Sequence, residues 1–475
     1  MLIELCYYCN HLFCYGLQFM KKTYWCKSAL LTDGWAKSVT IEVDVDGNIS
    51  AIKIDQEPES FVKLDTVIPG VPNLHSHAHQ RAMSGLGEKA GANKDSFWTW
   101  RVAMYHYLER IQPEDLYHIA KMLYLEMLKS GYTNVAEFQY LHHDRNGKAF
   151  DNRAEMTLQC QQAAVDVGIG FTALPVLYNH GGFGGQPPIE GQKRFLNNAE
   201  GFLEIVSSIQ QKQVNNLNVS VGIAPHSLRA VTGDLLHEVL DALSANKPVT
   251  HIHIAEQLKE VSDCVSWSGR RPVEWLFENF SVDEKWCLIH ATHMTQEETR
   301  SLATSGAIAG LCPTTEANLG DGFFNMVQYG NERGHWGIGS DSHISISPVE
   351  ELRWLEYGQR LLTNERNVLS EDTSPHTGQI LLTTALKGGA SACDRAIGKI
   401  AVGKRADFTV LDSSHPRLYG REAEQLIDSW IFSGNENCVS HVFVGGDCNV
   451  ADGHHKDELT IADNYRNTID LLANR

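Results

Sequence analysis

The feature that most constrains the fold is a repeating alternation, from about Thr66 to Asn364, of an apolar strand, a polar or glycine-bearing loop and an amphipathic helix. Strands that alternate with helices form parallel sheets, and eight such units can close into a barrel. We therefore predict a (β/α)8 TIM-like barrel over residues 66–396. Eight segments have the character of its strands: 66–72, 133–139, 170–177, 219–224, 249–254, 286–291, 307–312 and 336–340.

The chain on either side of this region alternates as short strands around tight turns. Residues 20–65 contain a hairpin around Asp46-Gly47, and residues 397–458 return to the same pattern. Neither segment can bury a core alone, so we predict one small β-sandwich domain built from both chain ends. Residues 459–475 indicate a C-terminal helix, and residues 1–19 are interpreted as an N-terminal extension.

Composition and charge exclude several classes of protein. The formal net charge of -18 over 475 residues argues against binding to nucleic acid or to an anionic membrane, since both need a basic surface. No membrane-spanning run or signal peptide is evident, which favours a cytoplasmic protein. Most of the 11 cysteines are isolated in apolar settings, as in reduced proteins. The pair Cys6-x-x-Cys9 could start a zinc knuckle, but no second pair follows at ligand spacing.

Four predicted strands end in residues typical of metal ligands. Side chains alternate along a strand, so His75 and His77 point the same way. A single histidine of this kind is usually a core or surface residue. In a barrel, however, the C-terminal strand ends share one face, so four such ends predict a metal site there. The other three ends carry, in chain order, His251 and His253 with Glu256, then His290, then Asp341.

Three motifs resemble the amidohydrolase superfamily, and within it the formimidoylglutamate deiminases of histidine degradation. They are Pro72-Asn-Leu-His-Ser-His-Ala-His-Gln80, His251-Ile-His-Ile-Ala-Glu256-Gln and Leu288-Ile-His-Ala-Thr-His293. The resemblance extends from about residue 25 to the C-terminus. It implies hydrolysis of N-formimino-L-glutamate to N-formyl-L-glutamate and ammonia by a metal-bound hydroxide. It also implies one divalent metal ion, with Zn²⁺ favoured, held by His75, His77, His253 and Asp341.

The chemistry agrees with these implied roles. A bound metal lowers the pKa of water from about 15.7 to roughly 7. Glu256 would carry the proton from water to the departing nitrogen, unless it is an ordinary solvated carboxylate at a helix start. His290 would polarise the attacked carbon, and Asp341 would help to deprotonate the water. His251 is a rival ligand to His253, although the His-x-x-Glu register favours His253, and the absence of a lysine near strand four favours one metal.

A substrate with two carboxylates calls for arginine contacts. By resemblance, the pocket would be lined by Gln80, Tyr140, His226 and Arg229. Arg101, from the long first loop, is a further candidate for a carboxylate contact, although each arginine could instead be an ordinary surface residue.

Two other functions stay open. The chain could be a related deaminase acting on a purine, pyrimidine or triazine, whose flat substrates would call for aromatic stacking. It could also be a non-catalytic barrel scaffold, which would be expected to have lost ligands. The superfamily suggests a possible homodimer, and the glycine-rich stretch Gly181–Gly185 is interpreted as a mobile loop over the barrel mouth.

Overall fold

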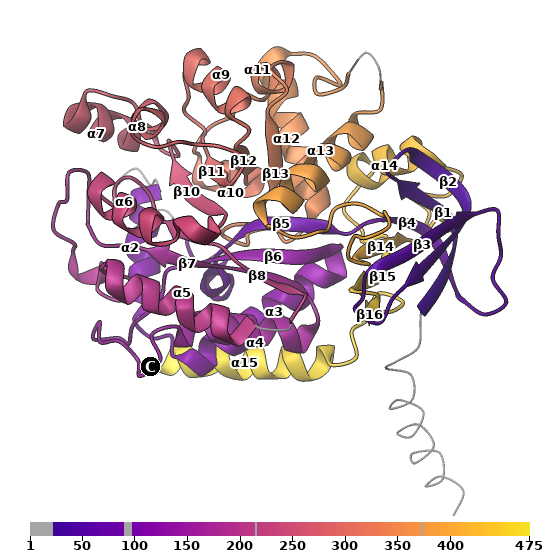
Figure 1. Cartoon of the computed structure of the whole chain (residues 1–475), viewed down its shortest axis with the longest axis horizontal. Helices are drawn as coiled ribbons and strands as arrows, with labels where there is room; N and C mark the ends of the chain where they lie inside the picture. The colour runs from indigo at the N-terminus through magenta and orange to yellow at the C-terminus, as the bar shows by residue number, and fades with distance from the viewer. Residues whose placement is uncertain (1–21, 90–96, 214–215, 372–373) are drawn as a thin grey trace, which may run out of the picture.

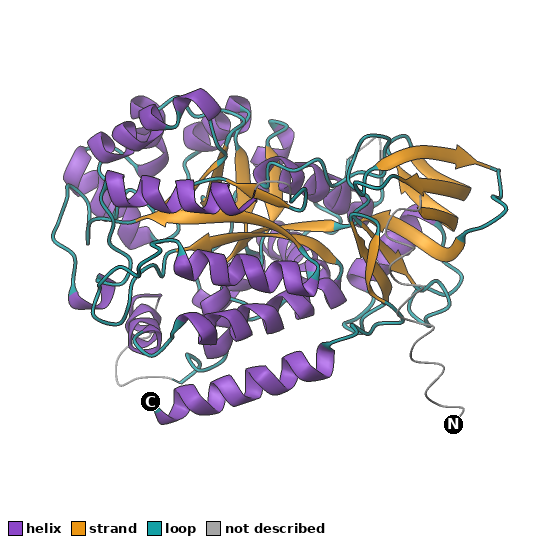
Figure 2. Cartoon of the chain, turned by 60° about the horizontal axis from the view of Figure 1, so that its bottom comes forward, coloured by secondary structure: helices purple, strands orange, loops and turns teal. Residues whose placement is uncertain are grey.

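The computed structural model describes residues 22–89, 97–213, 216–371 and 374–475. The N-terminal extension and the Cys6-x-x-Cys9 pair lie outside these residues. The larger part of the chain is a parallel barrel surrounded by helices (Figures 1 and 2). Its strands are β5 (Val71–Ser76), β6 (Tyr132–Gln139), β7 (Gly170–Leu177), β8 (Val219–Val221), β9 (Ala224–Pro225), β10 (Thr250–Ile254), β11 (Trp286–His290), β12 (Ile308–Leu311) and β13 (His335–Ile338).

Two parallel sheets close on each other to make the barrel. One has the order β5-β6-β7-β8 with β9 beside β7, and the other has the order β10-β11-β12-β13. Parallel bridges join them on both sides: Ser76 with Asp341, and Ser227 with His253. The Asp341 N–H donates to the His75 carbonyl at 3.1 Å. The closure confirms the predicted (β/α)8 fold and brings the histidine-bearing strand ends to one face of the barrel.

The strand predicted at 66–72 is wrong in its limits. It is two strands, β4 (Val62–Pro69) and β5, that meet at Gly70. The Gly70 N–H donates to the Asp407 carbonyl at 3.1 Å, whereas the next N–H, of Val71, donates at 3.2 Å to the carbonyl of Gly131, which directly precedes β6. A Cβ on Gly70 would lie 2.2 Å from a Thr133 methyl, so only glycine fits this passage from one sheet to the other.

Helices cover the outside of the barrel. The helix after the first loop is α3, which begins with Pro113 and ends before Gly131, whose φ of +103° favours glycine. The strand predicted at 219–224 is divided into β8 and β9. No helix in the described part of the chain has both the length and the apolar character to cross a membrane. The helices are α2 (Phe97–Leu108), α3 (Pro113–Ser130), α4 (Glu155–Val167), α5 (Ala199–Gln213), α6 (Gly233–Ala242), α7 (Leu258–Ser268), α8 (Pro272–Asn279), α9 (Gln296–Ser305), α10 (Pro313–Leu319), α11 (Met326–Asn331), α12 (Pro348–Thr363), α13 (Thr377–Ala392), α14 (Ala423–Phe432) and α15 (Glu458–Asn474).

Strands from both chain ends form a second, separate sheet beside the barrel (Figure 1). Its order is β16-β15-β14-β4-β1-β2-β3. The Tyr24 ring of β1 lies 5.0 Å from the Phe443 ring of β15, although two strands separate them, so the sheet curls around its own core. Because β4 belongs to this sheet, it crosses the domain limit predicted at 65/66. The remaining strands are β1 (Lys22–Leu31), β2 (Gly34–Val43), β3 (Ile49–Ile54), β14 (Phe408–Leu411), β15 (Val439–Val444) and β16 (Asp447–Val450).

Candidate active site

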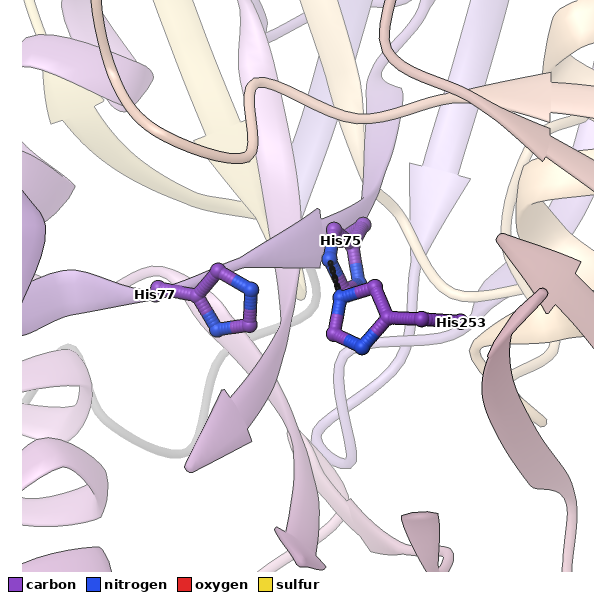
Figure 3. A group of neighbouring side chains, drawn as sticks. All are labelled: His75, His77 and His253. Atoms are coloured by element: carbon purple, nitrogen blue, oxygen red, sulfur yellow. Dashed lines mark hydrogen bonds between the residues drawn. The ribbon is translucent and has the colours of Figure 1, made fainter. Parts of the chain in front are cut away.

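Three imidazoles converge at the C-terminal end of the barrel (Figure 3). His75 lies on β5, His77 directly follows it, and His253 lies on β10. One ring nitrogen from each lies within 4.8 Å of the other two, and the Nε2 atoms of His75 and His253 are 3.0 Å apart. All three side chains are buried.

The outer nitrogens of two of these rings define their orientation. His77 Nδ1 lies 2.9 Å from the Phe138 carbonyl, and His253 Nδ1 lies 3.0 Å from the His226 carbonyl. A carbonyl can only accept, so each Nδ1 carries the hydrogen and each Nε2 turns a lone pair inward. Burial is the main factor that lowers the pKa of both rings and lowers that of His75 to about 3. The rings are therefore neutral at pH 7.

Asp341, which follows β13, lies beside two of these rings, and with His75 and His290 it forms a second group that could hold a metal ion. Its Oδ1 lies 3.3 Å from His77 Nε2 and 3.5 Å from His75 Nε2. Burial alone would raise the pKa of Asp341, but a hydrogen bond with His75 and the neighbouring imidazoles hold it well below its usual range. Inward lone pairs beside a carboxylate repel one another unless a cation lies between them. The donor set therefore fits one divalent metal ion.

The structure separates the two histidines of β10. His251 is also buried, but its Nε2 lies 2.8 Å from the carbonyl of Ala392, at the end of α13. It lies two residues below His253, about 6.6 Å deeper in the barrel at roughly 3.3 Å per residue. His251 is accordingly absent from the group of converging nitrogens, which contains His253.

The backbone around the site is held in an uncommon conformation. Positive φ values occur at the ends of β10 and β11 and in the loop after β13. The residues are Ala255 (+50°), His290 (+67°), Ala291 (+47°), Asp341 (+44°) and His343 (+61°). Such a conformation is unfavourable for side chains other than glycine and persists only where surrounding contacts impose it. Contacts with the surrounding structure therefore hold the backbone here against its local preference.

Glu137 on β6 holds the segment that carries His77. Its carboxylate accepts hydrogen bonds from the Ser76 hydroxyl at 2.6 Å, the Ala78 N–H at 2.6 Å and the Tyr124 hydroxyl at 3.0 Å. Ser76 and Ala78 are the residues on either side of His77. Glu137 is fully buried, so these contacts are shielded from water.

Glu256 and His290 stand next to the converging nitrogens. His290 Nε2 lies 3.8 Å from Asp341 Oδ2 and 3.9 Å from Glu256 Oε1. Its other nitrogen, Nδ1, lies 3.3 Å from the Glu316 carboxylate. Glu256 is only 4% exposed, which argues against a solvated carboxylate, and burial raises its pKa to about 7. A carboxyl with such a pKa can both take up and release a proton near neutral pH.

The five predicted substrate contacts share one cavity with these groups. The cavity is lined, among others, by Gln80, Arg101, Tyr140, His226 and Arg229 together with His77, His253, Glu256, His290 and Asp341. Arg229 lies 3.8 Å from Glu256, and the Gln80 amide donates to the Tyr140 hydroxyl at 3.1 Å. Both arginines flank the Trp98 ring, at 5.7 Å for Arg101 and 5.6 Å for Arg229. None of residues 181–185 is among the residues that line this cavity in the described chain, and the loop's predicted mobility stays a prediction.

The sequence reading missed Tyr178, Tyr105 and Glu316. Tyr178 lines the cavity directly after β7, a position at a strand end that a search of all strand ends would include. Tyr105 lines it from α2, and its hydroxyl accepts a hydrogen bond from Arg101. Glu316 lies on the short α10 and has no local sequence signal, because its partner His290 is 26 residues away.

Comparisons with known proteins agree with this geometry. Residues 66–448 match the model of the amidohydrolase family. The chain is 51% identical to a formimidoylglutamate deiminase from Pseudomonas aeruginosa, over 90% of this chain and 95% of that protein. It superposes on an amidohydrolase from Brucella melitensis with a TM-score of 0.90 and 42% identity, covering 95% and 100% of the two chains. An adenosine deaminase from Xanthomonas campestris with bound zinc shares the fold, with a TM-score of 0.77 at 20% identity, covering 95% and 98%. The chain belongs to the amidohydrolase family.

Proposed function

We propose that the protein hydrolyses N-formimino-L-glutamate to N-formyl-L-glutamate and ammonia, the step expected of a formimidoylglutamate deiminase in histidine degradation. The similarity to the Pseudomonas aeruginosa deiminase extends over nearly the whole of both chains. The observation that carries the proposal is the presence of two arginines, Arg101 and Arg229, in the same cavity as Glu256 and the converging histidines. Guanidinium groups suit a substrate with two carboxylates, whereas a flat, uncharged ring would not need them.

His75, His77, His253 and Asp341 would hold one divalent metal ion, and we propose zinc. Three neutral nitrogens and one carboxylate are a donor set that zinc favours, and they leave room for a further ligand. Such a metal, when bound, would supply Lewis-acid activation of water near neutral pH. The two carbonyls behind His77 and His253 orient the rings for this task.

The proton transfers are assigned to Glu256 and its neighbours. Glu256 takes a proton from the attacking water as the water oxygen bonds to the formimino carbon. His290, held by Glu316 on one side, faces Asp341 and Glu256 with its Nε2 and stabilises the charge that develops on the attacked group. Glu256 then returns its proton to the terminal nitrogen, which becomes an amino group. Glu256 next transfers the proton of the new hydroxyl group to the same nitrogen as the bond from carbon to that nitrogen breaks, so ammonia leaves and the formyl C=O remains.

The test is an assay of ammonia release by purified, zinc-loaded protein. N-formimino-L-glutamate should be hydrolysed, whereas guanine and cytosine, presented at the same concentrations, should release no ammonia. Activity on a ring substrate without activity on N-formimino-L-glutamate would contradict the proposal. Absence of bound metal and of all hydrolysis after zinc addition would favour a non-catalytic scaffold.

The role of the cavity arginines is tested separately. Arg229→Ala should lower kcat/KM for N-formimino-L-glutamate by about 10- to 100-fold, the effect of losing a hydrogen bond to a charged group. Arg270→Ala is the matched control, because Arg270 pairs with Glu278 on the surface. An unchanged kcat/KM in Arg229→Ala would contradict the assignment. A homodimer, a cytoplasmic location and the domain limit at 396/397 are further parts of the proposal.

A further inference from the structure

We propose that the Tyr178 hydroxyl donates a hydrogen bond to the substrate carboxylate that Arg101 binds, which makes Tyr178 a specificity-determining residue. The inference rests on the proposed function, since it concerns the same cavity and the same dianionic substrate. Tyr178 follows the end of β7, is 4% exposed and lines the cavity. Its ring packs against His226 at 4.6 Å and Phe195 at 5.6 Å, so the ring has a defined position.

Two neighbouring groups donate hydrogen bonds to the Tyr178 oxygen. The Gln192 amide lies 2.7 Å from it and an Arg101 terminal nitrogen lies 3.2 Å from it. Arginine can only donate. The Gln192 amide is also a donor here, because its oxygen already accepts the Ile189 N–H at 2.8 Å, which leaves only its NH₂ for Tyr178. The Tyr178 oxygen is therefore an acceptor in both contacts.

A phenol has one hydrogen to donate in addition to its acceptor capacity. Since both contacts use the oxygen as an acceptor, this hydrogen is still available. Among the described residues, no acceptor is placed for it, and the side chain faces the cavity. Accepting two hydrogen bonds, one of them from a cation, also polarises the O–H group and makes it a stronger donor.

The surroundings of this O–H group favour an anion. Arg101 supplies the positive charge. Its Nε–H donates a hydrogen bond to the Tyr105 hydroxyl, which holds the guanidinium in place. A guanidinium and a hydroxyl that line the same cavity side by side suit the two oxygens of a carboxylate. Arg229, by contrast, lies 3.8 Å from Glu256. Each arginine can thus bind one of the two substrate carboxylates.

The first experiment compares Tyr178→Phe with the wild-type protein on N-formimino-L-glutamate. Tyr178→Phe keeps the ring and removes the hydroxyl. We expect kcat/KM to fall by about 10- to 100-fold, mostly through KM, because a hydrogen bond to a charged group is lost. The matched control is Tyr329→Phe, which removes a buried hydroxyl bonded to the His335 carbonyl far from the cavity, and should leave kcat/KM unchanged.

Two substrate analogues identify the contact. N-formimino-4-aminobutyrate lacks the α-carboxylate, and N-formimino-L-2-aminobutyrate lacks the side-chain carboxylate. The fall in kcat/KM caused by Tyr178→Phe should disappear for one of them and persist for the other. An unaltered kcat/KM on N-formimino-L-glutamate, or an equal fall for all three compounds, would overturn the inference.

A last comparison separates direct contact from an effect through Arg101. In an Arg101→Leu background, Tyr178→Phe should still lower kcat/KM, because the hydroxyl itself bonds the substrate. No further fall in the double variant would show that Tyr178 only holds Arg101 and would overturn the proposal. A wild-type protein that is inactive on N-formimino-L-glutamate would instead refute the proposed function, and the inference with it.

Discussion

Glu137 offers a direct test of how the barrel holds the proposed metal site. Its carboxylate bonds the residues on both sides of His77 and the Tyr124 hydroxyl. Glu137→Leu removes all three contacts at nearly the same volume. The Ala78 N–H would be left buried without an acceptor, which costs about 1–3 kcal/mol. The loss of each hydroxyl contact should cost about 0.5–1.5 kcal/mol, and the Ser76 hydroxyl has His343 Nε2 at 3.3 Å as another partner.

The free energy of unfolding should therefore fall by about 2–6 kcal/mol in Glu137→Leu. Glu137→Gln is the matched control. Its amide oxygen can accept from Ala78 and its NH₂ can face hydroxyls that turn to accept, so we expect a loss of about 1 kcal/mol. Because His77 is held less firmly, zinc should also leave Glu137→Leu faster than it leaves the control.

Both quantities can be measured on purified, zinc-loaded protein. Denaturant titration gives the free energy of unfolding, and a chromogenic chelator gives the rate of zinc loss. The reasoning is refuted if Glu137→Leu matches Glu137→Gln in both measurements, because the three hydrogen bonds would then contribute nothing to the strand end.

Three further outcomes are expected. Glu256→Gln should lower kcat by about 10²- to 10⁴-fold, while elemental analysis should find the same metal content as in the wild type. A loss of metal in this variant would contradict a role for Glu256 in proton transfer alone. His251→Gln should keep the full metal content, because His251 bonds the Ala392 carbonyl; a metal-free variant would identify it as a ligand. Burial raises the pKa of Glu137 from 4.5 to about 7, so the folded protein binds a proton there that the unfolded chain has released. This stabilisation is fully present below about pH 4.5 and is lost as the pH rises through about 7. In denaturant titrations from pH 5 to 8, the free energy of unfolding should therefore fall more steeply with pH in the wild type than in Glu137→Gln. Parallel curves for the two proteins would contradict this prediction.

The positions of the main chemical groups were predictable from the sequence. Period-two alternation puts His75 and His77 on one side of a strand, and a parallel barrel brings the ends of its strands to one face. These two rules predict that His253, His290 and Asp341 lie next to the first pair, although up to 266 positions separate them along the chain. The observed distances from Asp341 Oδ1 to His75 and His77, 3.5 Å and 3.3 Å, agree with this expectation.

Other features depended on contacts that no local pattern records. The break at Gly70 exists because two sheets meet there, and the residues that crowd it, such as Thr133, come from a strand more than sixty positions away. His251 and His253 have the same side-chain direction on β10. Their depth in the barrel distinguishes them, and depth follows from the register of neighbouring strands.

Residue types and their spacing along each strand thus determined by themselves that the chain forms a parallel barrel with a histidine-rich rim. Only the tertiary structure decided how the rim is supported and what shape of ligand it can accept. Glu137 behind His77, Glu316 behind His290, and Gln192 and Arg101 around Tyr178 are all pairings between distant segments. The physical reason is that periodicity reports which face a side chain takes, whereas a hydrogen bond requires donor and acceptor within about 3 Å, and that distance exists only once the segments have packed.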